Sequence, residues 1–366
     1  MWLHPQLAKV PAALMIAAWA ILRWRLKPSP RIHLVYVLIA LMAATVLIGT
    51  ALHLTAPYAV VYAARWLPFL VMTAVLVDLA SSQVSIRLLF GSAMAGATVA
   101  AVGGLFSVLV LHEPRATGPG IDPNDLACSL VAALPFVLAF SPRLPLVRAG
   151  LVIAVVAIAL AVVATMSRGG LVALAAVLAW VLLRRAVRAR AILYAGALTL
   201  VAAVAAVFFA RAELVQALVA KQHIGQRNVD VRFLRWEAAL RMLSQHPIVG
   251  TGPGGFRTEY AGASHIAELD VPAQQVIAHS MYLETAAEFG AIGLVILLAL
   301  IATAFLSAEH ALRLGADRQV AIVVQASLIG VVVSGVFLSG QYFFSLWSVI
   351  ALACAIGIRA QYGDSV

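Results

Sequence analysis

Long apolar segments separated by short polar connections recur along almost the whole chain. An α-helix needs about 20 apolar residues to cross the roughly 30 Å hydrocarbon layer of a bilayer, and most of these segments approach or reach that length. Hydrophobic residues make up 63% of the chain and charged residues only 11%, whereas soluble domains carry roughly a quarter charged residues. The sequence therefore predicts an all-α polytopic membrane protein rather than a soluble domain.

Eleven segments are predicted to span the membrane. They lie near residues 10–24, 33–51, 57–77, 86–111, 126–141, 147–165, 168–183, 191–210, 283–306, 320–339 and 342–359. One long polar loop separates the eighth segment from the ninth. The chain is therefore divided into an N-terminal bundle at 1–210, a loop at 211–282 and a C-terminal bundle at 283–366.

The placement of basic residues predicts how these spans are oriented. Lys and Arg gather in alternate connections and in the tail, at Arg23, Arg25, Lys27, Arg31, Arg87, Arg143, Arg148, Arg184, Arg185, Arg188, Arg190, Arg313, Arg318 and Arg359. Cytoplasmic connections carry such an excess, so these are expected to face the cytoplasm. The outward connections are then 52–56, 112–125, 166–168, 211–282 and 340–341. This topology accounts for the net charge of +10, and no nucleic-acid partner is expected.

An odd number of spans places the N-terminus outside and the C-terminus inside. The first apolar segment lacks a small-residue cleavage site and is followed by further spans, so no cleavable signal peptide is expected. Cys128 and Cys354 lie in separate apolar segments. Two such cysteines predict neither a disulfide framework nor a metal site, and no cofactor is expected.

The loop at 211–282 is the only long polar stretch of the chain. Within it, residues 229–245 have apolar side chains at helical spacing, and Arg232 and Arg235 lie off that apolar line. A helix of this kind can lie on a membrane surface, and long loops cross the membrane whatever their charge. A functional arginine can be carried on such a helix, so both interpretations stay open.

A glycine-rich stretch follows, with G-x-G-x-x-G spacing from Gly250 to Gly255. A dinucleotide site is a poor interpretation, because no strand–turn–helix unit surrounds the stretch and Pro253 lacks a backbone donor. The glycines instead predict a tight turn. Further along, His279 lies at the mouth of the ninth span, where Ser280 is expected to cap the helix.

Three further polar residues lie in or near the other outward connections. Arg168 belongs to a very short hairpin, where it either extends to the interface or has a function. Arg65 lies about eight residues into the third predicted span, and an arginine inside the membrane is costly enough to be a functional candidate. Asn124 follows the predicted turn at Asp122-Pro123 and is expected to cap the fifth span.

The order and spacing of these motifs resemble the O-antigen ligase and polymerase superfamily of membrane glycosyltransferases. The matching pieces are DPNDLA at 122–127, SRGGL at 167–171, R-x-x-x-W at 232–236, HPIVGTGPGGF at 246–256, HSMYLE at 279–284 and EFGAIGL at 288–294. The resemblance covers about residues 120–300, and the flanking spans match by hydropathy alone. Members of this family often have twelve spans with both ends inside, which predicts one further N-terminal helix.

The resemblance implies roles for three residues. His279 matches the histidine thought to activate the acceptor hydroxyl, and Arg168 and Arg232 match arginines that bind the lipid diphosphate. It also implies a metal-independent, GT-C-type reaction that inverts the anomeric centre. The residues expected to support these three are Arg65, Arg235, Asn124 and Tyr282.

Elementary chemistry agrees with these roles. Arginine donates bidentate hydrogen bonds to phosphate oxygens and stabilises the charge that grows on a diphosphate leaving group. Histidine titrates near the working pH and can accept the proton of a sugar hydroxyl. The outward loops contain no well-spaced acidic cluster, and of the near pair Asp122 and Asp125 one is expected to cap a helix, so no magnesium site is expected.

The sequence thus predicts a glycosyltransferase of the bacterial inner membrane, with its site on the periplasmic face. The expected donor is an undecaprenyl-diphosphate-linked glycan. The acceptor is lipid A–core for a ligase, another glycan for a polymerase, or a protein. A secondary transporter or flippase for a lipid-linked glycan is an alternative, although transporters usually carry mid-membrane polar features in both halves and only Arg65 qualifies here. A non-catalytic scaffold for polysaccharide export is a third reading.

Overall fold

The computed structural model describes residues 9–26, 31–118, 122–209, 231–264 and 276–363, and these residues form helices and no strand. The helices are α1 (Lys9–Leu26), α2 (Leu34–Leu52), α3 (Ala59–Ser82), α4 (Ile86–Leu109), α5 (Pro123–Ala133) with the 3-10 turn η1 (Leu134–Ala139), α6 (Pro145–Ala164), α7 (Arg168–Leu183), α8 (Ala189–Phe209), a helix over 231–245, α10 (Gly255–Ala263), α11 (Met281–Arg313), α12 (Arg318–Ser334), η3 (Gly340–Tyr342) and α13 (Phe344–Tyr362). The predicted all-α class is confirmed. Parts of the long polar loop, 210–230 and 265–275, lie outside the described residues.

Each predicted span coincides with a helix or, for the fifth, with α5 and η1 together. Among the described residues, six helices are long and apolar enough to cross a membrane by themselves: α2, α3, α4, α6, α11 and α13. The apolar helices at 123–139, 168–183 and 318–334 are shorter. The chain is thus a multi-pass membrane protein, and the number of eleven spans stays a prediction.

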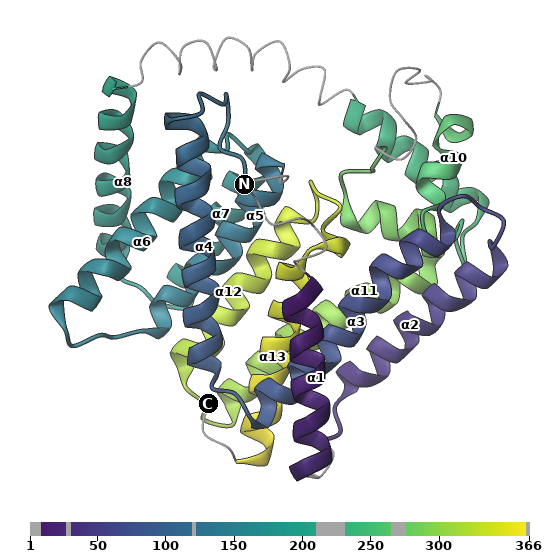
Figure 1. Ribbon diagram of the computed structural model, residues 1–366, viewed down its shortest axis with the longest axis horizontal. Helices are drawn as coiled ribbons and strands as arrows, with labels where there is room; N and C mark the ends of the chain where they lie inside the picture. The colour runs from purple at the N-terminus through teal and green to yellow at the C-terminus, as the bar shows by residue number, and fades with distance from the viewer. Residues whose placement is uncertain (1–8, 27–30, 119–121, 210–230, 265–275, 364–366) are drawn as a thin grey trace.

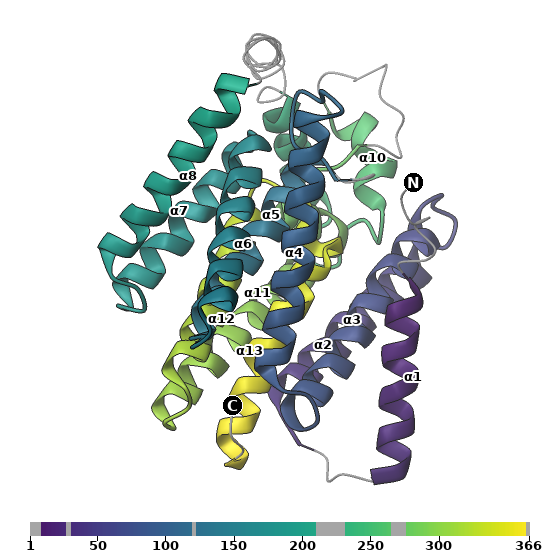
Figure 2. The same cartoon turned by 60° about the vertical axis from the view of Figure 1, so that its left-hand side comes forward.

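The connections between helices gather at two opposite ends of the bundle (Figures 1 and 2). We call one of them the α10 end. It carries α10 and the connections α2–α3, α4–α5, α6–α7 and α12–α13, which are the predicted outward ones. At the opposite end, Arg87 pairs with Asp317 at 2.7 Å, and Arg359 donates to the carbonyl of Ala80 at 2.7 Å. Arginines there thus bind acidic side chains and the free carbonyls that helix ends leave.

The cap of α5 differs from the sequence prediction. Asp122, not Asn124, is the N-cap residue, and its carboxylate accepts the backbone N–H of Asn124 at 2.8 Å. Pro123 occupies the first helical position, where a missing N–H leaves no bond unmade. The helix therefore begins at the proline, and Asn124 already lies inside its first turn.

The cap of α11 also differs from its prediction. Ser280 occupies the N-cap position as expected, but its hydroxyl makes no capping hydrogen bond. This end of the helix is held instead by the backbone, because the N–H of Met281 donates to the carbonyl of Gly335 at 2.8 Å. The start of α11 is therefore tied to the connection after α12.

The 231–245 helix packs on protein through the apolar line that the sequence predicts. Ala238 and Met242 are buried in one cluster with Phe256 and Tyr260 of α10. A membrane surface is therefore not needed to cover this line. This packing fixes the rotation of the helix about its axis. It therefore also fixes the direction of the face that carries Arg232.

Candidate functional site

The helix α11 is broken close to the α10 end of the bundle. Gly290 has φ 62° and ψ −161°, which is far from helical geometry. An unbroken helix would join the N–H groups of Ala291 and Ile292 to the carbonyls of Ala287 and Glu288. These two N–H groups and two carbonyls therefore need other partners.

The glycine-rich turn at 246–254 supplies partners for all four groups. Its carbonyls at Pro247 and Ile248 accept the two N–H groups, at 2.8 and 3.3 Å. Its N–H groups at Thr251 and Gly252 donate to the two carbonyls, at 3.0 and 2.8 Å. The motifs HPIVGTGPGGF and EFGAIGL are thus two halves of one backbone interlock.

Glycine is required in this turn by space as well as by conformation. Gly250 has φ 70°, and a Cβ atom there would lie 2.4 Å from the backbone of Glu288. Gly252 has φ 83° and would meet His53 of the α2–α3 connection at 2.7 Å. The predicted tight turn is confirmed, and it is wedged between α11 and the end of the α2–α3 hairpin.

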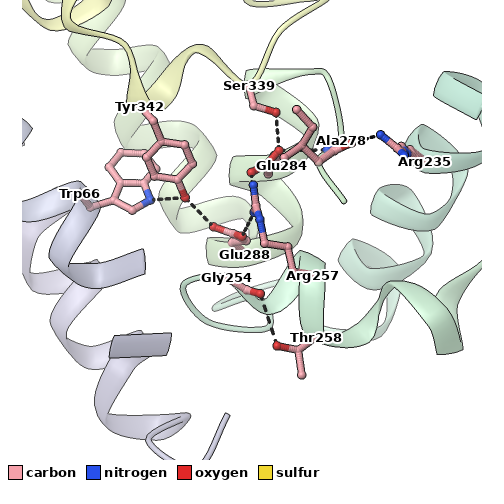
Figure 3. A network of polar contacts seen from close by, with 11 residues as sticks. Trp66, Arg235, Gly254, Arg257, Thr258, Ala278, Glu284, Glu288, Ser339 and Tyr342 are labelled. Atoms are coloured by element: carbon pink, nitrogen blue, oxygen red, sulfur yellow. Dashed lines mark hydrogen bonds and ion pairs between the residues drawn. The ribbon is translucent and has the colours of Figure 1, made fainter. Parts of the chain in front are cut away.

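Three charged side chains are buried beside this turn: Arg257 of α10 and Glu284 and Glu288 of α11 (Figure 3). We call them the buried charge cluster. The Arg257 guanidinium lies 3.0 Å from a Glu284 oxygen and 3.5 Å from a Glu288 oxygen, and none of the three side chains is more than 2% exposed. Burial lowers the pKa of Arg257, but the two carboxylates raise it more, so the guanidinium stays charged.

Aromatic residues of α3 and η3 surround the buried charge cluster. The hydroxyl of Tyr342 donates to Glu288 at 3.3 Å and accepts the indole N–H of Trp66 at 3.1 Å (Figure 3). The guanidinium of Arg257 lies 4.2 Å from the centre of the Tyr62 ring. The cluster therefore joins α10 and α11 to the membrane-spanning bundle.

His279 lies just before α11 in a left-handed backbone conformation, with φ 52°. The peptide unit that precedes Ala278 is bound on both sides. Arg235 donates to the Ile277 carbonyl at 3.3 Å, and the Ala278 N–H donates to Glu284 at 3.0 Å. The structure thus brings the predicted Arg235 and His279 into one neighbourhood.

A group of arginines lies between the 231–245 helix and the α4–α5 connection. Burial lowers the pKa of Arg232; Asp122 raises it, and Arg115 and Arg235 lower it again. Arg115 donates to the Asn124 side chain at 3.2 Å. We call Arg115, Arg232 and Arg235 the arginine group, and Asp122 is a carboxylate that acts on Arg232 within it.

Arg168 is the first residue of α7, and its side chain is exposed at the α10 end. The Ser167 hydroxyl caps the helix by accepting the Gly170 N–H at 3.2 Å. Arg115 donates to the carbonyl of Thr165, in the same short hairpin, at 2.8 Å. Arg168 is therefore linked to the arginine group through the hairpin backbone.

The remaining candidates have more local contacts. Arg65 is exposed near the start of α3, and its guanidinium lies 4.4 Å from the centre of the Tyr62 ring. The hydroxyl of Tyr282 donates to the carbonyl of Val332 at 2.8 Å, which joins α11 to α12. Within the described ranges, no group of three or more His, Cys, Asp or Glu residues is placed to hold a metal ion.

Sequence reasoning missed four of the residues that build this region. Arg115 could have been noticed as an arginine in a short outward connection, against the positive-inside bias. Glu284 and Glu288 stand four residues apart on one face of a helix, inside motifs that were recognised. Arg257 gave no local signal, because only the fold brings it to these carboxylates.

Fold and site together define a multi-pass helical membrane protein with buried and clustered charges at one end of its bundle. The family model described as O-Antigen ligase matches residues 153–298. This match confirms, for these residues, the resemblance to the O-antigen ligase and polymerase superfamily that the motifs indicated. The match includes every motif except DPNDLA, and it supports a role as a polysaccharide ligase or polymerase. A comparison with curated proteins gives no match.

Proposed function

We propose that this chain is a glycosyltransferase of the bacterial inner membrane that works on the periplasmic face. It moves a glycan from an undecaprenyl-diphosphate carrier to the hydroxyl of an acceptor sugar, as an O-antigen ligase or a surface-polysaccharide polymerase. The observation that carries this proposal is the arginine group, which lies beside the segment that holds His279, in a chain whose residues 153–298 match the O-antigen ligase family model.

In the proposed reaction, His279 accepts the proton of the acceptor hydroxyl. The hydroxyl oxygen attacks the anomeric carbon, whose bond to the diphosphate oxygen breaks from the opposite side. The diphosphate leaves with the electron pair, and the anomeric centre is inverted. Arg168 and Arg232 bind the diphosphate and stabilise the charge that it gains.

The electrostatics of the arginine group favour an anionic ligand. Arg232 is partly buried, which lowers its pKa, and among the charges acting on it Asp122 raises the pKa while Arg115 and Arg235 lower it. A diphosphate placed there would satisfy several guanidinium donors at once. We therefore propose Arg115, which contacts Thr165 and Asn124, as a further diphosphate-binding residue.

Complementation of a gene deletion tests the proposal. Arg168→Ala, Arg232→Ala, Arg115→Ala and His279→Ala are each expected to abolish or strongly reduce surface glycan, because removal of one preorganised donor costs on the order of 100–1,000-fold in rate. Arg143→Ala is the matched control, since Arg143 is an exposed arginine at the opposite end of the bundle. The amount of each variant in the membrane is measured by immunoblot.

The amount of surface glycan in these variants distinguishes a transferase from the alternatives. Full surface glycan from all four site variants contradicts the transferase, whereas loss in the four variants with retention in Arg143→Ala supports it. The lipid-linked material that accumulates then identifies the subclass. Long polymer on the carrier indicates a ligase, and single repeat units indicate a polymerase.

The broken helix α11 is the feature that a transporter could use, since transporters bind substrates at discontinuous helices. In this chain, however, the turn at 246–254 bonds the backbone groups that the break at Gly290 frees. The backbone groups freed by the break are therefore used to hold the turn. This observation favours the transferase over the transporter.

A further inference from the structure

One peptide unit next to His279 is held from both sides by oppositely charged side chains (Figure 3). The Ile277 carbonyl and the Ala278 N–H belong to the same planar peptide group. The carbonyl accepts from Arg235 at 3.3 Å, and the N–H donates to Glu284 at 3.0 Å. The cation thus binds the carbonyl, which is the negative end of the peptide dipole, and the anion binds the N–H, which is the positive end.

The carboxylate of Glu284 is itself held by two other parts of the chain. One oxygen accepts from Arg257 of α10 at 3.0 Å, and the other accepts from the Ser339 hydroxyl as well as from Ala278. The side chain is 0% exposed. Because three segments meet at this carboxylate, it cannot follow a movement of the 277–279 segment without breaking buried hydrogen bonds.

His279, the next residue after Ala278, has a strained backbone. His279 has φ 52°, and a non-glycine residue in this region costs about 1–3 kcal/mol, so it persists only where the surroundings impose it. Without the bonds to Arg235 and Glu284, the segment could relax. The histidine ring would then leave the position that the fold gives it.

We propose that Glu284 is a positioning residue for His279, acting through the Ala278 N–H. Its task is to keep the backbone of His279 left-handed, so that the ring stays where the acceptor hydroxyl is bound. The effect of Glu284 on catalysis rests on the proposed function. Its effect on the backbone of His279 does not, so the two effects can be tested separately.

The chain provides a charge-matched control for Glu284. Glu284→Gln and Glu288→Gln each remove one buried carboxylate and leave the other to balance Arg257. Of these two glutamates, it is Glu284 that accepts the Ala278 N–H. A general loss of buried charge would therefore affect both variants alike, whereas loss of positioning affects one.

The first measurement uses purified protein and the undecaprenyl-diphosphate-linked glycan extracted from cells that lack this chain. We expect Glu284→Gln to lower kcat by about 100-fold, because a misplacement of about 1 Å has that effect. The KM for the donor is expected to change by less than about threefold, since the donor-binding arginines are untouched. Glu288→Gln is expected to retain kcat within about threefold, and Glu284→Asp to restore part of the rate.

The second measurement does not need turnover. Diethyl pyrocarbonate modifies histidine rings, and mass spectrometry reads the rate of modification at His279. We expect a rate in Glu284→Gln that differs from the native rate by about tenfold, on the order of the change that 1.4 kcal/mol of local stability would produce. Glu288→Gln is expected to leave the rate unchanged.

Equal effects of Glu284→Gln and Glu288→Gln in both measurements would overturn the positioning role. If His279→Ala keeps full activity, the proposed function fails, while a selective change of His279 modification in Glu284→Gln still supports the structural part. If Glu284→Gln does not accumulate in the membrane, Glu284→Asp is compared with Glu288→Asp, because both keep the charge and the change at Glu284 shortens the reach to Ala278.

Discussion

At the scale of single residues, Arg257 is the cation that balances two buried carboxylates. It is the guanidinium between Glu284 and Glu288, at 3.0 and 3.5 Å, and all three side chains are buried. Two carboxylates without a cation in such a place repel each other and have lost their hydration. The docking of α10 on α11 should therefore depend on this one side chain.

We expect Arg257→Met to lower the free energy of unfolding by about 3–5 kcal/mol, the loss typical of removing one partner of a buried ion pair. Arg241→Met is the control. Arg241 pairs at 3.1 Å with Glu237, which is 53% exposed, and such pairs contribute about 0–1 kcal/mol. Unfolding in detergent, followed by tryptophan fluorescence, measures both variants. Equal losses would show that Arg257 has no special role.

At the scale of elements, backbone hydrogen bonds join α11 to the turn at 246–254 and hold these two segments together at the α10 end. Four backbone hydrogen bonds cross between the two segments around Gly290. They replace bonds that an unbroken helix would make within itself. The turn thereby fixes where α10 begins, and with it the place of Arg257.

A pair of glycine substitutions tests the interlock. Gly315→Ala should cost about 1 kcal/mol, because Gly315 has φ 83° but no atom within 4 Å of an added Cβ. Gly290→Ala should cost clearly more, because its Cβ would lie 2.3 Å from the backbone of Ile248. Thermal unfolding compares the two. Hydrogen exchange of the 246–254 peptides should rise only in Gly290→Ala, and no rise there would contradict the interlock.

At the scale of the whole molecule, the two sets of connections lie at opposite ends of the bundle, and this makes the predicted orientation testable. Cysteine is introduced at Ala261, which is exposed in α10, or at Ser141, which is exposed at the opposite end. Cys128 and Cys354 are both buried and are replaced by alanine in this background.

A membrane-impermeant maleimide applied to spheroplasts is expected to label Ala261→Cys at once and Ser141→Cys only after permeabilisation. The reason is the excess of Lys and Arg at the Ser141 end, which the positive-inside rule places in the cytoplasm. The reverse labelling pattern would put the arginine group in the cytoplasm and would refute the periplasmic transferase.

Local patterns in the chain were enough for the helices, their order and the gathering of unusual polar residues in alternate connections. Hydropathy and helical periodicity act within one segment, so they can be read without knowing its neighbours. The family match confirms the family that the motifs indicated. The roles of His279, Arg168 and Arg232 stay predictions, which the variants above test.

Only the tertiary structure decided how these motifs meet. Asp122 rather than Asn124 caps α5, a local detail that the proline explains. The bonds around Gly290 and the placement of Arg257 between two glutamates join residues that are about 27–44 positions apart in the chain, and the hydrogen bond from the Ala278 N–H to Glu284 closes a non-helical segment. Such contacts depend on backbone groups and charges that have no periodic signal. They became visible only when the fold placed them side by side.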